Sequence, residues 1–177
     1  MSLEKGGETS EYALDYLFGE LLRYPRLSED PEAIQDTFEG MGISIGGRLI
    51  ERLMLRHSFS GTEPLDKVKF LCKEFWESMF QKKMGTPIHE HPLVTLPCPL
   101  DKLQTNHKGV FVLSESKFRL MNRFISSEPG VVVLIDRLML LTCGAIKGAL
   151  EGLGMPGVVT ADAKAFPAIT FHIKAIQ

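Results

Sequence analysis

The chain has 177 residues, of which 44% are hydrophobic and 24% are charged, and 20 Lys and Arg against 22 Asp and Glu leave a formal charge of −2. This composition is typical of a globular domain with one hydrophobic core, and the nearly balanced charge argues against nucleic acid as a partner. Three cysteines, an odd number set far apart, argue against a disulfide framework and favour a reducing, cytoplasmic compartment.

The first ten residues, MSLEKGGETS, are polar and rich in glycine. They predict a disordered lead-in over residues 1–10 rather than a secretory leader, followed by a single domain over residues 11–177. The most apolar window, residues 131–154, contains four charged side chains, so no membrane span is expected. Any contact with a membrane is therefore expected to be peripheral.

Two amphipathic helices are predicted first. From Leu14 to Leu21 apolar residues recur at the spacing of one helical stripe, and Pro25 ends the pattern. A longer helix begins near Ser28 or Asp30, both good N-caps, and is apolar on more than one side. Because one sheet cannot cover this much apolar surface, we expect a dimer contact here. Its predicted residues are Leu14, Leu17, Phe18, Leu21, Phe38, Met41, Ile45 and Leu49.

Two further helices are predicted in the core. The first begins near Thr62 or Pro64 and carries a wide apolar stripe from Val68 to Met79, and the second spans Leu134 to Leu153 with a glycine every four residues. Glycine costs a helix about 1 kcal/mol relative to alanine, so we expect another backbone or a bulky side chain packed close to this line. The predicted close-packing glycines are Gly42, Gly46, Gly144, Gly148 and Gly152.

Strands are predicted on either side of the last helix. In TNHKGVFVL the residues Asn106 to Gly109 predict a turn that leads into a strand, and two more strands are predicted at 158–163 and 168–176. The order ααα-ββ-α-ββ predicts an α+β fold, a small antiparallel four-stranded sheet flanked by four main helices. Residues 84–100 contain four prolines and fit no period, which predicts an irregular insertion.

No catalytic or metal site stands out. The residues that resemble metal ligands are His89, Glu90, His91, Cys98 and His107, but their spacing matches no usual zinc pattern and prolines stiffen the backbone between them. The segment GMGISIGG lacks the glycine spacing, the preceding strand and the lysine of a phosphate-binding loop. No nucleophile motif such as G-x-S-x-G occurs. We therefore expect no enzyme activity, no metal and no cofactor.

The second predicted helix resembles a known family. MGISIGGRLIERL (41–53) is similar to the M-G-φ-x-φ-G-x-R-L-x-E segment of the small α/β subunits of the transport protein particle (TRAPP), a vesicle-tethering complex of the early secretory pathway. Two blocks resemble the subunit-6 branch, LDKVKFLCKEFWESMFQKKM (65–84) and LQTNHKGVFVL (103–113). TCGAIKGALEGLG (142–154) and VVTADA (158–163) resemble the C-terminal helix and the strand after it.

The resemblance implies a small antiparallel sheet flanked by helices, whose first two helices dimerise with a sister subunit. It also implies a non-catalytic structural role, in the cytoplasm at early Golgi and ER membranes, within an assembly that promotes nucleotide exchange on a Rab GTPase. One sister subunit in this family carries an acyl chain on a cysteine just after the Gly-Arg-Leu helix. The corresponding stretch here, His57–Pro64, contains no cysteine, so lipidation is not carried over.

Two other functions stay open at this point. One is a small apolar-ligand carrier, whose cavity is bordered by the line of Gly144, Gly148 and Gly152. The other is a metal-dependent hydrolase that uses His89 and His91. Bound lipid or haem in the purified protein would favour the carrier, and elemental analysis without stoichiometric zinc would dismiss the hydrolase.

Overall fold

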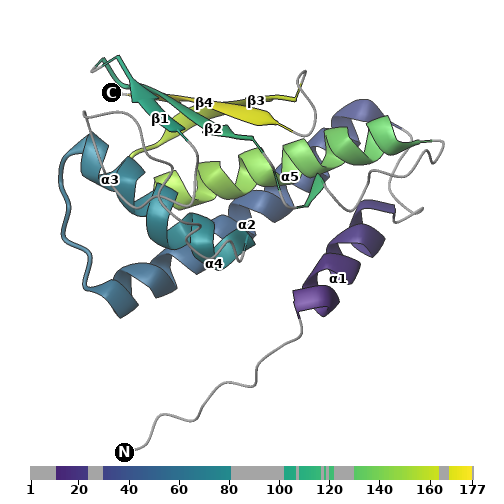
Figure 1. The fold of residues 1–177 in the computed structure, drawn as a ribbon, viewed down its shortest axis with the longest axis horizontal. Coiled ribbons are helices and arrows are strands. Elements are labelled where there is room, and N and C mark those ends of the chain that lie inside the picture. The colour runs from purple at the N-terminus through teal and green to yellow at the C-terminus, as the bar shows by residue number, and fades with distance from the viewer. Residues whose placement is uncertain are drawn as a thin grey trace, which may run out of the picture.

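A four-stranded antiparallel sheet with helices packed on one of its faces makes up the fold (Figure 1). The computed structural model describes residues 11–23, 30–80, 102–106, 108–116, 118, 120–121, 130–163 and 168–176. In chain order the elements are α1 (Glu11–Arg23), α2 (Pro31–His57), α3 (Pro64–Phe70), the π-helical turn η1 (Leu71–Phe75), α4 (Trp76–Phe80), β1 (Lys102–Thr105), β2 (Val110–Glu115), α5 (Val131–Gly152), β3 (Gly157–Asp162) and β4 (Ile169–Ala175). The predicted α+β fold class is confirmed. The predicted metal-like cluster and the whole 84–100 insertion lie outside the described residues, as does the lead-in.

The strands follow the order β1-β2-β4-β3, and every neighbouring pair is antiparallel. In the central pair Phe111 lies opposite Ile173 and Leu113 lies opposite Phe171, and all four side chains are buried against the helices. His172 and Lys174 alternate with them and are exposed on the other face. This alternation is the reason that the last strand could be predicted from its sequence.

The turn between β1 and β2 is formed by the residues at which the sequence predicts it. The Asn106 side-chain Oδ1 accepts hydrogen bonds from the backbone N–H of Lys108 at 2.9 Å and of Val110 at 3.1 Å. Gly109 has a φ of 79°, a left-handed conformation that glycine adopts without steric cost. The turn therefore starts β2 at Val110 in the register that turns Phe111 toward the core.

The long helix α2 is capped at both ends. Asp30 is the N-cap, and its side chain accepts a hydrogen bond from the backbone N–H of Glu32 at 3.2 Å, with Pro31 in the first turn. At the other end Ser58 adopts a left-handed conformation with a φ of 48° and closes the helix on the Met54 carbonyl. Of the two N-caps that the sequence allowed, the structure selects Asp30.

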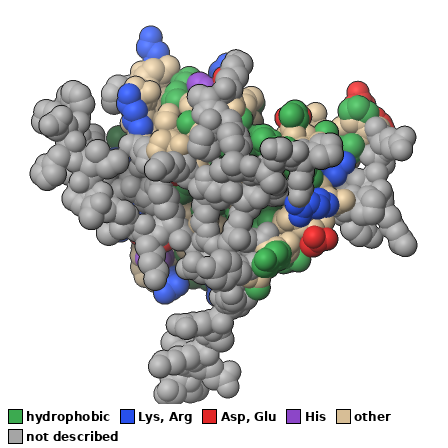
Figure 2. All heavy atoms as spheres, turned by 45° about the vertical axis from the view of Figure 1, so that its right-hand side comes forward, with side chains coloured by type: hydrophobic (Ala, Val, Ile, Leu, Met, Phe, Trp, Pro, Cys, Tyr) green, Lys and Arg blue, Asp and Glu red, His purple; other side chains and the backbone are tan. Residues whose placement is uncertain are grey.

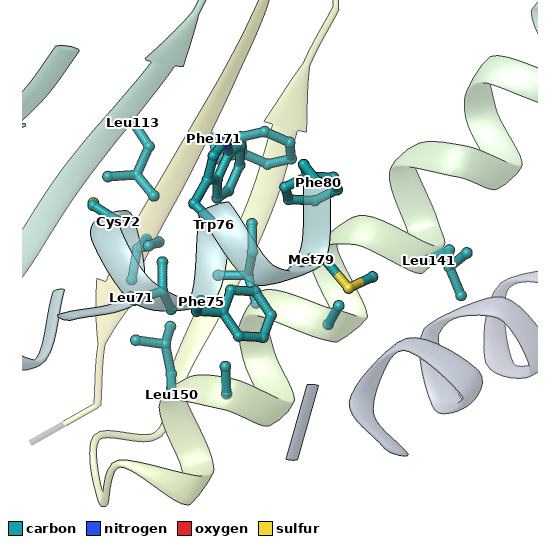
Figure 3. Close-up of a cluster of buried hydrophobic side chains, with 14 of the residues drawn as sticks. Leu71, Cys72, Phe75, Trp76, Met79, Phe80, Leu113, Leu141, Leu150 and Phe171 are labelled. Atoms are coloured by element: carbon teal, nitrogen blue, oxygen red, sulfur yellow. The ribbon is translucent and has the colours of Figure 1, made fainter. Parts of the chain in front are cut away.

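Residues 64–80 form one continuous helical segment in which the π-helical turn η1 widens the middle. The extra residue in this turn brings two neighbouring pairs, Leu71–Cys72 and Phe75–Trp76, into the core together. Figure 3 shows Trp76 beside Phe171 of the sheet, while Phe75 points toward Leu150 of α5.

Trp76 stands at the centre of an aromatic cluster. Its ring lies 4.6 Å from that of Phe80 and 5.5 Å from that of Phe171, between centroids. Its indole N–H donates to Glu115 Oε2 at 3.3 Å, and this carboxylate is buried. Because the chain has a single tryptophan, its fluorescence reports on the packing of helix, sheet and cluster at once.

Candidate interaction surface

The helices α2 and α5 pack with their backbones in contact, and glycines make this contact possible. Each of four glycines faces a carbonyl oxygen of the other helix so closely that an added Cβ would overlap it; the pairs are Gly42 with Leu141, Gly46 with Ala145, Gly144 with Glu39 and Gly148 with Ile43. The paired residue numbers rise together, so the two helices run parallel. Gly152 differs, because its added Cβ would meet the side chain of Ile50, at 2.5 Å from Cγ2.

An ion pair crosses the same helix contact. Lys147 Nζ of α5 lies 3.0 Å from Glu39 Oε1 of α2, and both side chains are about one third exposed. Cys143 lies close by on α5 as a half-buried free thiol. Burial, and after it the negative charge of Glu39, raises the pKa of the Cys143 thiol to about 12.

Cys143 is expected to resist alkylation in the folded chain. At pH 8 a thiol with this pKa holds roughly a thousandfold less thiolate than an ordinary cysteine, and thiolate is the nucleophile. Iodoacetamide labelling, followed by peptide mass spectrometry, should give a slow rate that keeps rising through pH 10. Since the pKa is raised in the folded state, the stability that the neutral thiol contributes is complete below about pH 9 and is lost as the pH approaches 12. Equal labelling rates in buffer and in urea at pH 8 would contradict this assignment.

The helix α1 is attached to the body of the molecule by two buried side chains and one arginine. Phe18 and Leu22 are buried in the core cluster. Arg137 of α5 donates from Nη1 to the carbonyl oxygen of Leu22 at 2.7 Å, and its guanidinium lies 5.7 Å from the ring centroid of Phe38 on α2. Arg137 therefore ties the end of α1 to the first turns of α2 and α5, and Figure 1 shows α1 at the end of the molecule where these two helices begin.

Seven of the eight predicted contact residues fall into three groups. Leu17 and Ile45 are exposed, Leu21, Met41 and Leu49 are half-buried, Phe18 and Phe38 are buried in the chain's own core, and the side chain of Leu14 lies outside the described residues. Phe38 has no exposed surface, and the guanidinium of Arg137 on α5 lies over its ring. It therefore offers nothing to a partner.

The sequence prediction missed Tyr16, which is as exposed as its neighbour Leu17. It was missed because it falls outside the predicted i, i+3, i+4 stripe, of which Phe18 is buried and Leu17 is exposed. We define the α1/α2 surface as six exposed or half-buried apolar side chains of these helices, namely Tyr16, Leu17, Leu21, Met41, Ile45 and Leu49. On the side shown in Figure 2, hydrophobic side chains reach the surface in small groups beside acidic and basic ones. Leu55, further along α2, is also exposed and was not predicted.

The cavity expected for an apolar-ligand carrier is not at the glycine line of α5. The backbone of α2 and the Ile50 side chain fill the space beside Gly144, Gly148 and Gly152. A cavity of about 470 Å³ does exist elsewhere, between the start of α3, the β1–β2 turn and the end of β4. Its lining includes Lys67, whose ammonium donates to the Gly154 carbonyl at 3.2 Å. The geometric premise of the carrier hypothesis was therefore wrong.

No three His, Cys, Asp or Glu side chains within the described part of the chain converge as metal ligands, and His89, His91, Cys98 and His107 lie outside it. None of the helices seen there combines the length and the hydropathy needed to cross a bilayer.

Comparisons with known proteins point to one family. The family model described as transport protein particle (TRAPP) component matches residues 14–176. Trafficking protein particle complex subunit 6b of Danio rerio is 30% identical over 167 residues, which cover 92% of this chain and 95% of that protein. Human trafficking protein particle complex subunit 6A is 37% identical over 139 residues, which cover 77% and 75%.

A solved structure shares the fold. It is a crystal structure of trafficking protein particle complex subunit 3 from Naegleria fowleri, covalently bound to palmitic acid. The TM-score is 0.64, the sequences are 19% identical, and the match covers 93% of this chain and 94% of that one. The similarity therefore extends over the whole arrangement of helices and sheet.

Proposed function

This chain belongs to the TRAPP component family, in the subunit-6 branch, and from that premise we propose that it is a non-catalytic structural subunit of a vesicle-tethering complex. In this proposal it forms a heterodimer with a sister subunit of the same fold through α1 and α2. The assembled complex acts at early Golgi and ER membranes from the cytoplasm and promotes nucleotide exchange on a Rab GTPase. The contribution of this chain is to hold neighbours in place.

The observation that supports the proposal is the α1/α2 surface. Leu17 is 65% exposed, and Ile45 is exposed on the middle of α2 between the half-buried Met41 and Leu49. Apolar area removed from water is worth about 25 cal/mol per Å², so covering these side chains favours association. The backbone contact with α5 is made at Gly42 and Gly46 of α2, and it leaves the neighbouring Ile45 exposed.

The proposal includes no acyl chain on this subunit. The related subunit 3 of Naegleria fowleri is covalently bound to palmitic acid. In this chain the segment after α2, His57–Pro64, contains no cysteine that could carry a thioester. Cys72 is buried, and Cys143 has a raised pKa, so neither offers a reactive thiolate.

Purification from the native cell tests the proposal. A tagged full-length chain, isolated under mild conditions and analysed by mass spectrometry, is expected to bring down other trafficking protein particle subunits in fixed stoichiometry. A chain that elutes alone, or a preparation of the lone chain that turns over a substrate reproducibly, would contradict a purely structural role. The matched variant for this experiment is Leu17→Asp.

A further inference from the structure

The outer edge of β3 carries backbone groups that the sheet does not use. The Ile176 N–H donates to the Pro156 carbonyl oxygen at 2.8 Å, and this pair extends the antiparallel register of β3 with β4. In an antiparallel ladder, residues that bond the neighbouring strand alternate with residues that do not. Counting by twos from Pro156, the even-numbered residues of β3 bond to β4. The odd-numbered residues therefore direct their N–H and C=O groups away from the sheet.

Two of these odd-numbered residues are accessible at the rim of the sheet. Val159 and Ala161 are half-buried, whereas Gly157 is buried. In the described part of the chain no turn, loop or neighbouring strand hydrogen-bonds to the outer edge of Val159 or Ala161. At this edge the sheet thus ends with two open N–H groups and two open C=O groups.

The two edge strands of the sheet differ in their protection. β1, at the opposite edge, has four residues and begins with the exposed Lys102. Short edge strands and lysine side chains hinder pairing with another chain. β3 has six residues, GVVTAD, without a lysine, a proline or an interruption of its register, and its one charged residue is the last. The β3 edge is therefore open to the addition of a strand.

A second copy of β3 fits this edge in antiparallel orientation. If a twofold axis passes between the two copies of Thr160, Val159 of each copy lies opposite Ala161 of the other. Each such pair exchanges two backbone hydrogen bonds, so the open groups of both strands are all satisfied. A register centred on Val159 would instead use the backbone of Gly157, which is buried.

The side chains suit the same register. On the open face of the sheet the two exposed Thr160 side chains lie directly opposite each other, and threonine pairs of this kind favour strand pairing. Asp162 of each copy lies opposite Val158 of the other, so the two carboxylates stay apart. On the face toward the helices the apolar side chains of Val159 and Ala161 meet. No like charges therefore oppose the contact.

We propose that β3 pairs with β3 of a second copy of this chain, in an antiparallel contact centred on Thr160 that joins two sheets into one. The contact is isologous and draws its strength from main-chain hydrogen bonds. Because each strand contributes only six residues, the contact is weaker than a standard protein interface and links chains that a larger assembly has already brought together. It uses neither α1 nor α2, so it goes beyond the proposed function and leaves both helices free for a sister subunit.

Amide hydrogen exchange of the full-length chain tests the pairing. The outward N–H groups of Val159 and Ala161 have no acceptor in the single chain, so they should exchange fast at low protein concentration. As the concentration rises their exchange should slow about tenfold or more, while that of Thr160, whose N–H bonds to β4, stays slow throughout. A contact through the helices would not change the exchange rates at β3.

Two variants test the same contact by sedimentation, in a full-length chain that also carries Leu17→Asp to weaken any contact through α1. Thr160→Lys should weaken self-association about tenfold or more, because the two lysines would lie opposite each other. Ala161→Pro removes an open N–H without removing a bond to β4, and it should have a similar effect. The matched control is Gln104→Lys, exposed on β1 in the same cross-strand row as Thr160, and it should stay within about twofold of the original.

Three results would overturn the inference. The first is fast exchange of Val159 and Ala161 at every concentration, and the second is an effect of Thr160→Lys no larger than that of Gln104→Lys. The third is exchange at β3 that slows only when a sister subunit is added, which would assign the edge to that subunit. Co-purification of sister subunits depends on α1 and α2 rather than on β3, so these results are distinct from a failure of the proposed function.

Discussion

Gly46→Ala is expected to destabilise the chain by about 2 kcal/mol or more, whereas Gly40→Ala, in the same helix, should stabilise it by about 0.5–1 kcal/mol. A Cβ at position 46 would overlap the Ala145 backbone, which cannot move without parting α2 from α5. Nothing lies within 4 Å of a Cβ at position 40, so that substitution only gains the better helix propensity of alanine. The same Gly→Ala change is therefore expected to lower the free energy of unfolding at position 46 and to raise it at position 40 of the same helix.

Urea unfolding followed by Trp76 fluorescence measures both effects, because Trp76 is the single tryptophan and lies in the core. Gly148→Ala serves as a second variant from the other helix, since its Cβ would overlap the Ile43 carbonyl. Gly148→Ala should lower the free energy of unfolding by an amount similar to that of Gly46→Ala. If alanine raises the free energy of unfolding equally at positions 40, 46 and 148, the backbones of α2 and α5 are not in contact.

Leu17→Asp is expected to weaken the heterodimer by about 2 kcal/mol or more, roughly 30-fold in Kd, while the fold persists. The side chain is largely exposed in the single chain, so the aspartate remains solvated there. In the proposed contact it would become buried without a partner, which costs free energy. Isothermal titration against the co-purifying sister subunit measures the loss.

The matched control is Val158→Asp. Val158 is 53% exposed on β3, on the face of the sheet away from the helices. Val158→Asp introduces the same charge in place of a comparably exposed apolar side chain. The Kd of this variant for the sister subunit should equal that of the original chain. If Leu17→Asp and Val158→Asp reduce binding equally, charge alone is responsible, and α1 does not form the contact.

Much of the fold could be predicted from local pattern. Alternation in Ile169, Phe171 and Ile173 marked β4, because a strand with one buried face has a period of two. Asn106 and Gly109 marked the hairpin, because their chemistry suits the turn itself. The π-helical turn could not be predicted, since the stripe from Val68 to Met79 fits an ordinary helix nearly as well. The wider turn arises where Cys72 and Trp76 both meet the sheet.

The candidate surface was harder to predict. Periodicity grouped Phe38 with Met41, Ile45 and Leu49, yet Phe38 lies in the core while Ile45 is exposed. The period of a helix tells which residues share a face, and it does not tell whether that face meets another element of the same chain or another molecule.

By itself the sequence determined the helices and strands, their order, and the residues of the caps and turns. It also indicated that the glycines of two helices pack against a neighbouring backbone or side chain. These properties depend on neighbours within a few residues, where backbone sterics and hydrophobic periodicity act directly. The tertiary structure alone decided that the glycines of α2 and α5 meet each other in parallel, that Arg137 ties α1 beside Phe38, and that Ile45 and Leu17 face outward. Those outcomes depend on contacts between residues that are about one hundred positions apart in the sequence. A pattern of neighbouring residues does not show which of several apolar surfaces will be buried against each other.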